Sequence, residues 1–111
     1  MRELNLHYPS CPIRNVLSRF SDKWSLLILL KLRSKEKMRY KELLNAIPDI
    51  SQKMLSTTLK HLENDHLITR EAYAEIPPRV EYSLTETGKE LMPVVQMMIE
   101  WAQVNFEVVT K

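Results

Sequence analysis

The sequence predicts a mainly helical α+β domain built around a β-hairpin, and three observations support this fold class. Apolar residues recur at helical spacing through residues 12–66. Two runs of alternating residues then flank a loop with two prolines, as in a hairpin. A second helical pattern follows to about residue 108. The chain of 111 residues fits one domain, and we expect an N-terminal arm at residues 1–10 and a single domain at residues 11–109.

Composition excludes several classes of protein. With 44% hydrophobic and 27% charged residues the chain is typical of globular proteins, and its net charge of +2 permits a nucleic-acid partner without requiring one. The lone cysteine, Cys11, excludes an intrachain disulfide. The N-terminus lacks the apolar run of a signal peptide, and the apolar run at residues 26–30 is far short of the ~20 residues of a membrane span. We therefore expect no membrane contact and a cytoplasmic location.

Catalysis and metal binding are not expected either. The sequence has no nucleophile–base arrangement, glycine-rich phosphate loop or carboxylate pair, and Gly88 is its single glycine. His7, His61 and His66 show no metal-ligand spacing with one another or with Cys11. The chain is therefore predicted not to be an enzyme, and to need no cofactor or metal.

Two helices are expected in the first third of the domain. Pro12 favours a helix start directly after Cys11, and this helix would run to about residue 20. Its apolar face would consist of Ile13, Val16, Leu17 and Phe20. Ser21 and Asp22 are good caps for a second helix at residues 23–33, which is apolar almost all round. A helix of this kind belongs in the middle of a core or between subunits.

The next two helices are separated by a turn of only three residues. Residues 39–47 read as a short helix, with Leu43, Leu44 and Ile47 inward, and Pro48 ends it. After residues 48–50, Ser51 would cap a helix whose apolar stripe consists of Leu55, Leu59 and Leu62. Two helices joined in this way predict a helix-turn-helix, in which the second helix enters the DNA major groove.

The outward face of that second helix is polar and positively charged. It carries Lys53, Thr57, Lys60 and Asn64, with Ser56 beside them, and the first carboxylate is Glu63. An ordinary solvated helix face, which is the alternative interpretation, usually mixes both signs of charge. The two lysines can neutralise phosphates or donate to guanine, Gln52 can pair with adenine, and Ser56 and Thr57 are short enough for the groove floor.

A β-hairpin follows the helix-turn-helix, with a connection too long for a two-residue turn. Its strands would be residues 68–73 and 80–84. A helix-turn-helix followed by a hairpin is a winged helix-turn-helix, and the wing tip would lie at residues 77–79. Arg79 there is expected to reach a phosphate or the minor groove, although an exposed solubilising arginine is the alternative. The predicted DNA-binding residues are Arg39, Tyr40, Lys41, Ser51, Gln52, Lys53, Ser56, Thr57, Lys60, Pro78 and Arg79, with Tyr40 equally suited to half-buried packing.

The last helix, capped by Thr85 and predicted for residues 86–108, has two apolar faces. One consists of Leu91, Val95, Met98 and Ala102, and Pro93 should kink the helix. A small domain has core for only one face, so the other is expected at a subunit interface. The predicted interface residues are Ile13, Leu17, Val94, Met97, Trp101, Val104 and Val108.

The chain resembles the HxlR-type transcriptional regulators, a family of small winged-helix proteins of bacteria and archaea. The matching segments, in order over residues 11–104, are Cys11-Pro12, residues 23–29 (KWSLLIL), 39–43 (RYKEL), 50–55 (ISQKML) and 77–88 (PPRVEYSLTETG). The resemblance implies a homodimer, packed through its first and last helices, that binds operator DNA. The family usually has glycines where Ser21 and Asp22 stand, and another where His66 stands, so the turns there are expected to differ.

Cys11 has two interpretations. A thiolate that caps the helix at Pro12 would face the positive end of the helix dipole, with Arg14 one turn along, and both favour reactivity. Some members of the resembled family sense oxidants or electrophiles through a cysteine at this position. The alternative is a small residue packed at the dimer interface. With no second cysteine, a switch would need a bridge between two copies of Cys11, a mixed disulfide or alkylation.

Together these features predict a homodimeric, sequence-specific DNA-binding regulator of transcription that recognises a pseudo-palindromic operator in double-stranded DNA. It would respond to oxidants or electrophiles if Cys11 is a sensor; the identity of a small-molecule effector is left open. The alternative is a winged-helix adaptor that binds another protein through its last helix and does not bind DNA specifically. A steep salt dependence and preference for one palindrome distinguish a regulator from an adaptor.

Overall fold

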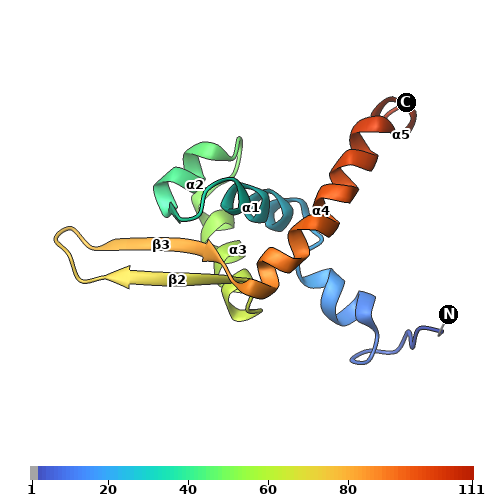
Figure 1. Cartoon of the computed structure of the whole chain (residues 1–111), viewed down its shortest axis with the longest axis horizontal. Coiled ribbons are helices and arrows are strands. Elements are labelled where there is room, and N and C mark those ends of the chain that lie inside the picture. The colour runs from blue at the N-terminus through green and yellow to red at the C-terminus, as the bar shows by residue number, and fades with distance from the viewer. Residues whose placement is uncertain (1–2) are drawn as a thin grey trace.

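The computed structural model describes residues 3–111 and confirms a mainly helical winged helix-turn-helix. Figure 1 shows a central group of helices, a hairpin that projects to one side and a long helix that projects to the other. The elements in chain order are two short turns, η1 (Pro12–Val16) and η2 (Leu17–Arg19), then α1 (Lys23–Ser34), β1 (Met38–Arg39), α2 (Tyr40–Ala46), α3 (Gln52–Asn64), β2 (Ile68–Tyr73), β3 (Arg79–Leu84), α4 (Glu86–Val104) and α5 (Phe106–Val109). No helix among these described residues is long and apolar enough to cross a membrane.

Helix α1 lies in the middle of the core, as its nearly continuous apolar surface predicts. The Asp22 carboxylate caps it by accepting from the Ser25 N–H at 3.1 Å, which satisfies a backbone donor that has no partner in the helix. Its side chains Ile28 and Leu29 are fully buried. They pack in one cluster with buried side chains of α2 and the turn after it, α3, the sheet and α4, among them Leu43, Ile47, Leu55, Leu59, Leu62, Ile68, Met92 and Val95.

The turn between α2 and α3 is as short as the sequence indicates. Helix α2 ends at Ala46, because the residue before a proline is disfavoured in the helical conformation and Ile47 is extended. Asp49 then adopts a positive φ of 67°, and Ser51 caps α3 by accepting from the Met54 N–H at 3.0 Å. Ile50, between them, is buried and joins the turn to the core. The turn therefore holds α3 at a set angle to α2.

The sheet has three strands, not the two that the sequence predicts. Its order is β1-β3-β2, and all neighbours are antiparallel. Met38 pairs with Tyr82 and Arg39 with Glu81, so Arg39 lies in a strand and α2 begins one residue later than predicted. A two-residue strand is too short to show alternation, and only its pairing with β3 defines it. Strands β2 and β3 pair from Ile68–Leu84 to Tyr73–Arg79, which leaves five loop residues, as in a long hairpin connection.

The predicted regular helix at residues 12–20 is wrong in form. The chain there makes a π-helical turn and then a single 3-10 turn. Of its predicted apolar face only Phe20 is buried, whereas Ile13, Val16 and Leu17 are about half exposed, at 49%, 55% and 45%. Short helices gain most of their stability from packing, and these three side chains have little to pack against within one protomer.

The last helix is also shorter than predicted. It continues through Pro93 but ends at Val104, and α5 adds one further turn after Asn105. The Asn105 side chain and backbone N–H both donate to the Trp101 carbonyl, at 2.9 and 3.0 Å, and close α4 there. Of the predicted inner stripe, Leu91 and Val95 pack on the core, whereas Met98 and Ala102 are exposed and line a hollow between α1 and α4. Met92 and Ile99 take part in the core packing instead.

Candidate nucleic-acid interface

The predicted outward face of α3 lies on the surface along its whole length. Gln52, Lys53, Ser56, Thr57 and Lys60 are all exposed, whereas the opposite stripe of Leu55, Leu59 and Leu62 is buried. No salt bridge within residues 3–111 involves Lys53 or Lys60, so neither ammonium group is neutralised by a neighbouring carboxylate. Glu63, the only carboxylate within α3, is half-buried. This face can therefore donate to negatively charged or acceptor groups.

Two of the predicted contact residues bond each other. The half-buried Tyr40, at the start of α2, has its hydroxyl 3.0 Å from the Gln52 carbonyl and 3.0 Å from the Ser56 hydroxyl. These bonds fix the N-terminal part of α3 against α2. Tyr40 therefore has the half-buried packing role that was its alternative interpretation. Ser56 keeps its remaining hydrogen-bonding capacity for an external group.

A hollow beside α3 is lined by an arginine, Arg70, that was not among the predicted DNA-contact residues. It has a volume of about 420 Å³ and lies between α3 and the sheet, with Lys60 and Arg70 among its lining residues. Arg70 pairs with Tyr82 in the sheet and is exposed. Alternation in β2 gave the position of Arg70 along the strand, but only the packing of the sheet beside α3 brings it next to Lys60.

The wing arginine, Arg79, contacts other residues of the wing. The Arg79 guanidinium lies 4.1 Å from the centre of the Tyr73 ring and forms a 2.9 Å salt bridge with Glu75. Pro78 is exposed at the tip, and so is Ile76, whose side chain has 102% relative exposure. Ile76 was also not among the predicted contact residues. It could have been found in the sequence as an apolar residue in an otherwise polar, proline-containing loop. An apolar side chain at a wing tip is of the kind that inserts between base steps in minor-groove binders.

The remaining predicted contacts lie at the beginning of α2. Arg39 and Lys41 are exposed, and Arg39 immediately precedes the helix. The Glu42 carboxylate accepts from the Arg39 N–H at 2.9 Å, and this bond holds the pKa of Glu42 below its ordinary value. The carboxylate thereby caps the helix and leaves the two basic side chains on the surface.

The predicted interface residues form a large exposed apolar surface. On α4 and α5 the side chains of Val94, Met97, Trp101, Val104 and Val108 are between 53% and 84% exposed, and Ile13 and Leu17 are about half exposed. Surfaces of this kind on soluble proteins mark interaction sites. Within residues 3–111 no element covers this surface.

Cys11 is buried, with 1% relative exposure. Its sulfur accepts from the Arg14 N–H at 3.5 Å, so it caps the π-helical turn as predicted, but the Arg14 side chain bonds the Leu6 carbonyl. The arm is tied to this turn by a further bond from the Asn15 amide to the Pro9 carbonyl. Within the described residues, no group of three or more histidine, cysteine or acidic side chains could hold a metal ion.

Comparison with known proteins supports the architecture described above. The model of the HxlR-like helix-turn-helix family matches residues 19–110. An uncharacterised helix-turn-helix transcriptional regulator of Methanothermobacter thermautotrophicus is 42% identical over 93 residues, which are 84% of this chain and 70% of that protein.

Two solved structures connect the fold with redox regulation in other proteins. The redox regulator HypR in its reduced form is 37% identical with a TM-score of 0.82, covering 89% of this chain and 97% of that one. Diamide-treated YodB from Bacillus subtilis is 36% identical with a TM-score of 0.73, covering 89% of this chain and 95% of YodB.

Proposed function

The chain belongs to the HxlR-like helix-turn-helix family of DNA-binding transcriptional regulators, and we propose that it acts as a homodimer on a pseudo-palindromic operator. In this proposal α3 of each protomer enters one major groove, and the two recognition helices lie about 34–36 Å apart on one face of the duplex. The wings lie over the flanking DNA.

The polar, unneutralised face of α3 carries this proposal. Its side chains are exposed and include two lysines free of salt bridges within the described residues. Phosphate contacts position a protein on DNA, and hydrogen bonds to base edges specify the sequence. Lys53 and Lys60 suit phosphates or guanine, Gln52 suits adenine, and Thr57 suits the groove floor. Arg39 and Lys41 at the start of α2 are suited to the backbone of the same site.

Substitution of α3 side chains tests this assignment. We expect Lys53→Ala and Thr57→Ala each to weaken operator binding by about 1–3 kcal/mol if they contact bases. If Lys53 contacts only a phosphate, its replacement should instead reduce the slope of log affinity against log salt concentration by about one. Operator affinity is measured by fluorescence anisotropy on DNA selected from genomic fragments, over a series of salt concentrations.

The matched controls make the same chemical changes at positions outside α3. Lys111→Ala removes the same charge at the far end of the chain, and Thr87→Ala shortens an exposed threonine on α4. Both should bind the operator like the parent protein, and all four variants should melt at nearly the parent temperature. Parent-like operator affinity in both α3 variants would remove α3 from the interface.

A response to oxidants through Cys11 is a second, narrower proposal, favoured by a chain of hydrogen bonds. The Asn15 N–H donates to the Cys11 carbonyl at 3.0 Å, and the Arg19 guanidinium donates to the Asn15 amide oxygen at 2.8 Å. The same guanidinium forms a 2.6 Å salt bridge with Asp65, the residue that ends α3. A group added to the buried Cys11 sulfur must displace the turn that carries Asn15 and Arg19, and so disturb α3.

Glutathione disulfide provides the test. The Cys11 thiolate attacks one sulfur of the disulfide, forms a mixed disulfide and releases one glutathione thiol. We expect the modified protein to bind its operator several-fold more weakly, and dithiothreitol to restore binding. Arg19→Gln should react equally but lose most of this effect. Unchanged affinity after complete modification, verified by mass spectrometry, would assign Cys11 to packing alone.

A further inference from the structure

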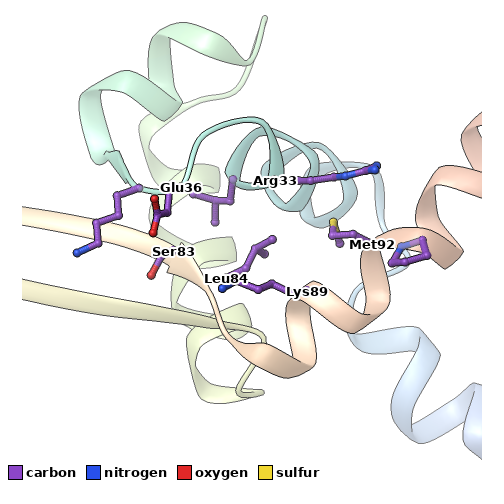
Figure 2. Close-up of a pocket in the computed structure, with 9 residues that line it drawn as sticks. Arg33, Glu36, Ser83, Leu84, Lys89 and Met92 are labelled. Carbon is purple, nitrogen blue, oxygen red and sulfur yellow. The ribbon is translucent and has the colours of Figure 1, made fainter.

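We propose that a pocket between α1, β3 and α4 is a binding site for a small amphipathic organic anion, such as an aryl carboxylate. The pocket has a volume of about 520 Å³, within the range of small-molecule sites. Figure 2 shows that its walls come from elements far apart in the sequence, with Arg33 on α1, Ser83 and Leu84 on β3, and Lys89 and Met92 on α4.

The pocket combines an apolar floor with a positively charged rim. Leu32 and Met92 are 2% and 3% exposed, and with Leu84 and Pro93 they offer a surface for a ring or short hydrocarbon chain. The lining residues Arg33, Lys37 and Lys89 are cations, and Glu36 is the only carboxylate among them. An apolar surface next to an excess of positive charge matches a molecule with a hydrophobic body and one acidic group.

The interactions that the rim cations make with other side chains are weak enough for a ligand to replace them. Lys89 lies 3.5 Å from Glu86, and Lys37 lies 3.6 Å from Glu71; in both pairs the side chains are largely exposed. Such pairs contribute little in water. Arg33 uses one nitrogen to donate to the Gln96 side chain at 2.7 Å, and its other donors remain for a carboxylate.

Arg33 and Glu36 lie at different ends of the pocket, which orients the ligand. Glu36, on the segment between α1 and β1, and Ser83 lie at one end, whereas Arg33 lies near Met92 at the other. The acidic group of the ligand would therefore lie towards Arg33, away from Glu36, and Lys89 on α4 adds positive charge between these two ends. The site also joins the wing strand β3 to α4, so its occupancy would affect the angle between the wing and the last helix.

Binding is tested on the whole protein without DNA, so the result does not depend on the proposed operator or dimer. The probes are phenylacetate and its neutral isostere phenylacetamide, titrated to 10 mM while ¹H–¹⁵N spectra are recorded. We expect phenylacetate to bind and phenylacetamide to bind about tenfold more weakly or not at all. The shifted amide signals should belong to residues 32–37, 83–84 and 89–92.

Three variants establish the charge dependence. The double variant Arg33→Gln/Lys89→Gln should lose about tenfold in affinity for phenylacetate. Glu36→Gln removes the repelling carboxylate and should tighten binding roughly two- to fivefold, a gain that a damaged fold would not produce. Lys23→Gln, at the other end of α1, is the matched control and should bind like the parent protein.

Several results would overturn the proposal. These are the absence of phenylacetate binding at 10 mM, equal binding of the amide, or shifts confined to residues 26–30 and 95–102, where a separate apolar pocket lies between α1 and α4. Equal affinity of the double variant and the parent protein would also overturn it.

Discussion

His66 holds a backbone conformation that costs most residues free energy. Its φ is +62°, in the left-handed region, directly after the end of α3. The Leu67 N–H donates to the Leu62 carbonyl and the His66 N–H to the Glu63 carbonyl, both at 3.0 Å. These two bonds form a Schellman motif, in which glycine is the usual residue at the left-handed position. The family's usual glycine at this point therefore has a physical reason, and the turn keeps its geometry in this chain in spite of the histidine.

We expect His66→Gly to stabilise the protein by about 1 kcal/mol, because glycine removes the steric cost of the left-handed conformation. Urea unfolding followed by circular dichroism measures the change. His66→Asn should gain a smaller amount, since asparagine tolerates this region, and His66→Ala should gain nothing. A His66→Gly protein less stable than the parent would show that the imidazole contributes more than the backbone strain costs.

The single glycine is required for a close approach and not for its backbone angle. A Cβ at Gly88 would lie 2.2 Å from the Leu67 carbonyl oxygen, which accepts from the Thr85 N–H at 3.1 Å. The Thr85 hydroxyl in turn accepts from the Gly88 N–H at 3.0 Å. The first turn of α4 therefore packs directly on the backbone where β2 begins.

At the scale of elements, the start of α2 is held by one charged cap. Glu42 accepts from the Arg39 N–H, and this bond depresses the pKa of the carboxyl. A carboxyl whose pKa is lowered on folding stabilises the protein above its unfolded pKa of about 4.3. That stabilisation is lost as the pH falls through the lower pKa of the folded state.

Glu42→Gln tests this dependence. Glutamine can still accept the Arg39 N–H but does not titrate. We expect the parent protein to be more stable than Glu42→Gln at pH 7 and the difference to shrink as the pH falls from 5 to 3, measured by urea unfolding at each pH. Glu90→Gln, at an exposed position of α4, is the control. A difference that stays constant over this pH range would show that the charge of Glu42 has no part in capping.

At the scale of the whole molecule, α4 has more apolar surface than its own protomer covers. The helix packs on α1 through Met92 and Val95, then extends beyond the core, where Met97 and Trp101 are 69% and 62% exposed. Under the proposal of a homodimer, a second copy would cover this surface and set the distance between the two copies of α3. The reading of a palindrome would then depend on α4 as much as on α3.

We expect Met97→Glu and Trp101→Glu to convert a dimer into monomers, because a charge in an apolar interface loses its hydration. Light scattering after size-exclusion chromatography should give twice the chain mass for the parent and one chain mass for both variants. Gln103→Glu adds the same charge at an exposed polar position of α4 and should remain dimeric. Affinity for a full palindrome should fall much more than affinity for a half-site. A parent protein of one chain mass would contradict the homodimer.

The helix-turn-helix, the wing and the polar face of α3 could all be predicted from the sequence alone. These features depend on local signals: the caps Asp22, Ser51 and Thr85, the stop at Pro48, and the periodic stripe of leucines. Each of these signals involves residues only a few positions apart, so each can be recognised from the amino-acid sequence. The predicted DNA contacts on α3 are on the surface for the same reason, because the buried stripe determines which side chains face outward.

Features that depend on partners distant in the sequence could not be predicted in this way. Strand β1 exists only through its pairing with β3, and Arg70 joins Lys60 only because the sheet packs beside α3. The pocket near Arg33 is assembled from α1, β3 and α4, and no local pattern predicts it. The irregular turn at residues 12–19 also reflects packing, since short helices gain most of their stability from tertiary contacts. Local hydrogen bonds and periodicity decide which elements form, and long-range packing decides which of their side chains meet.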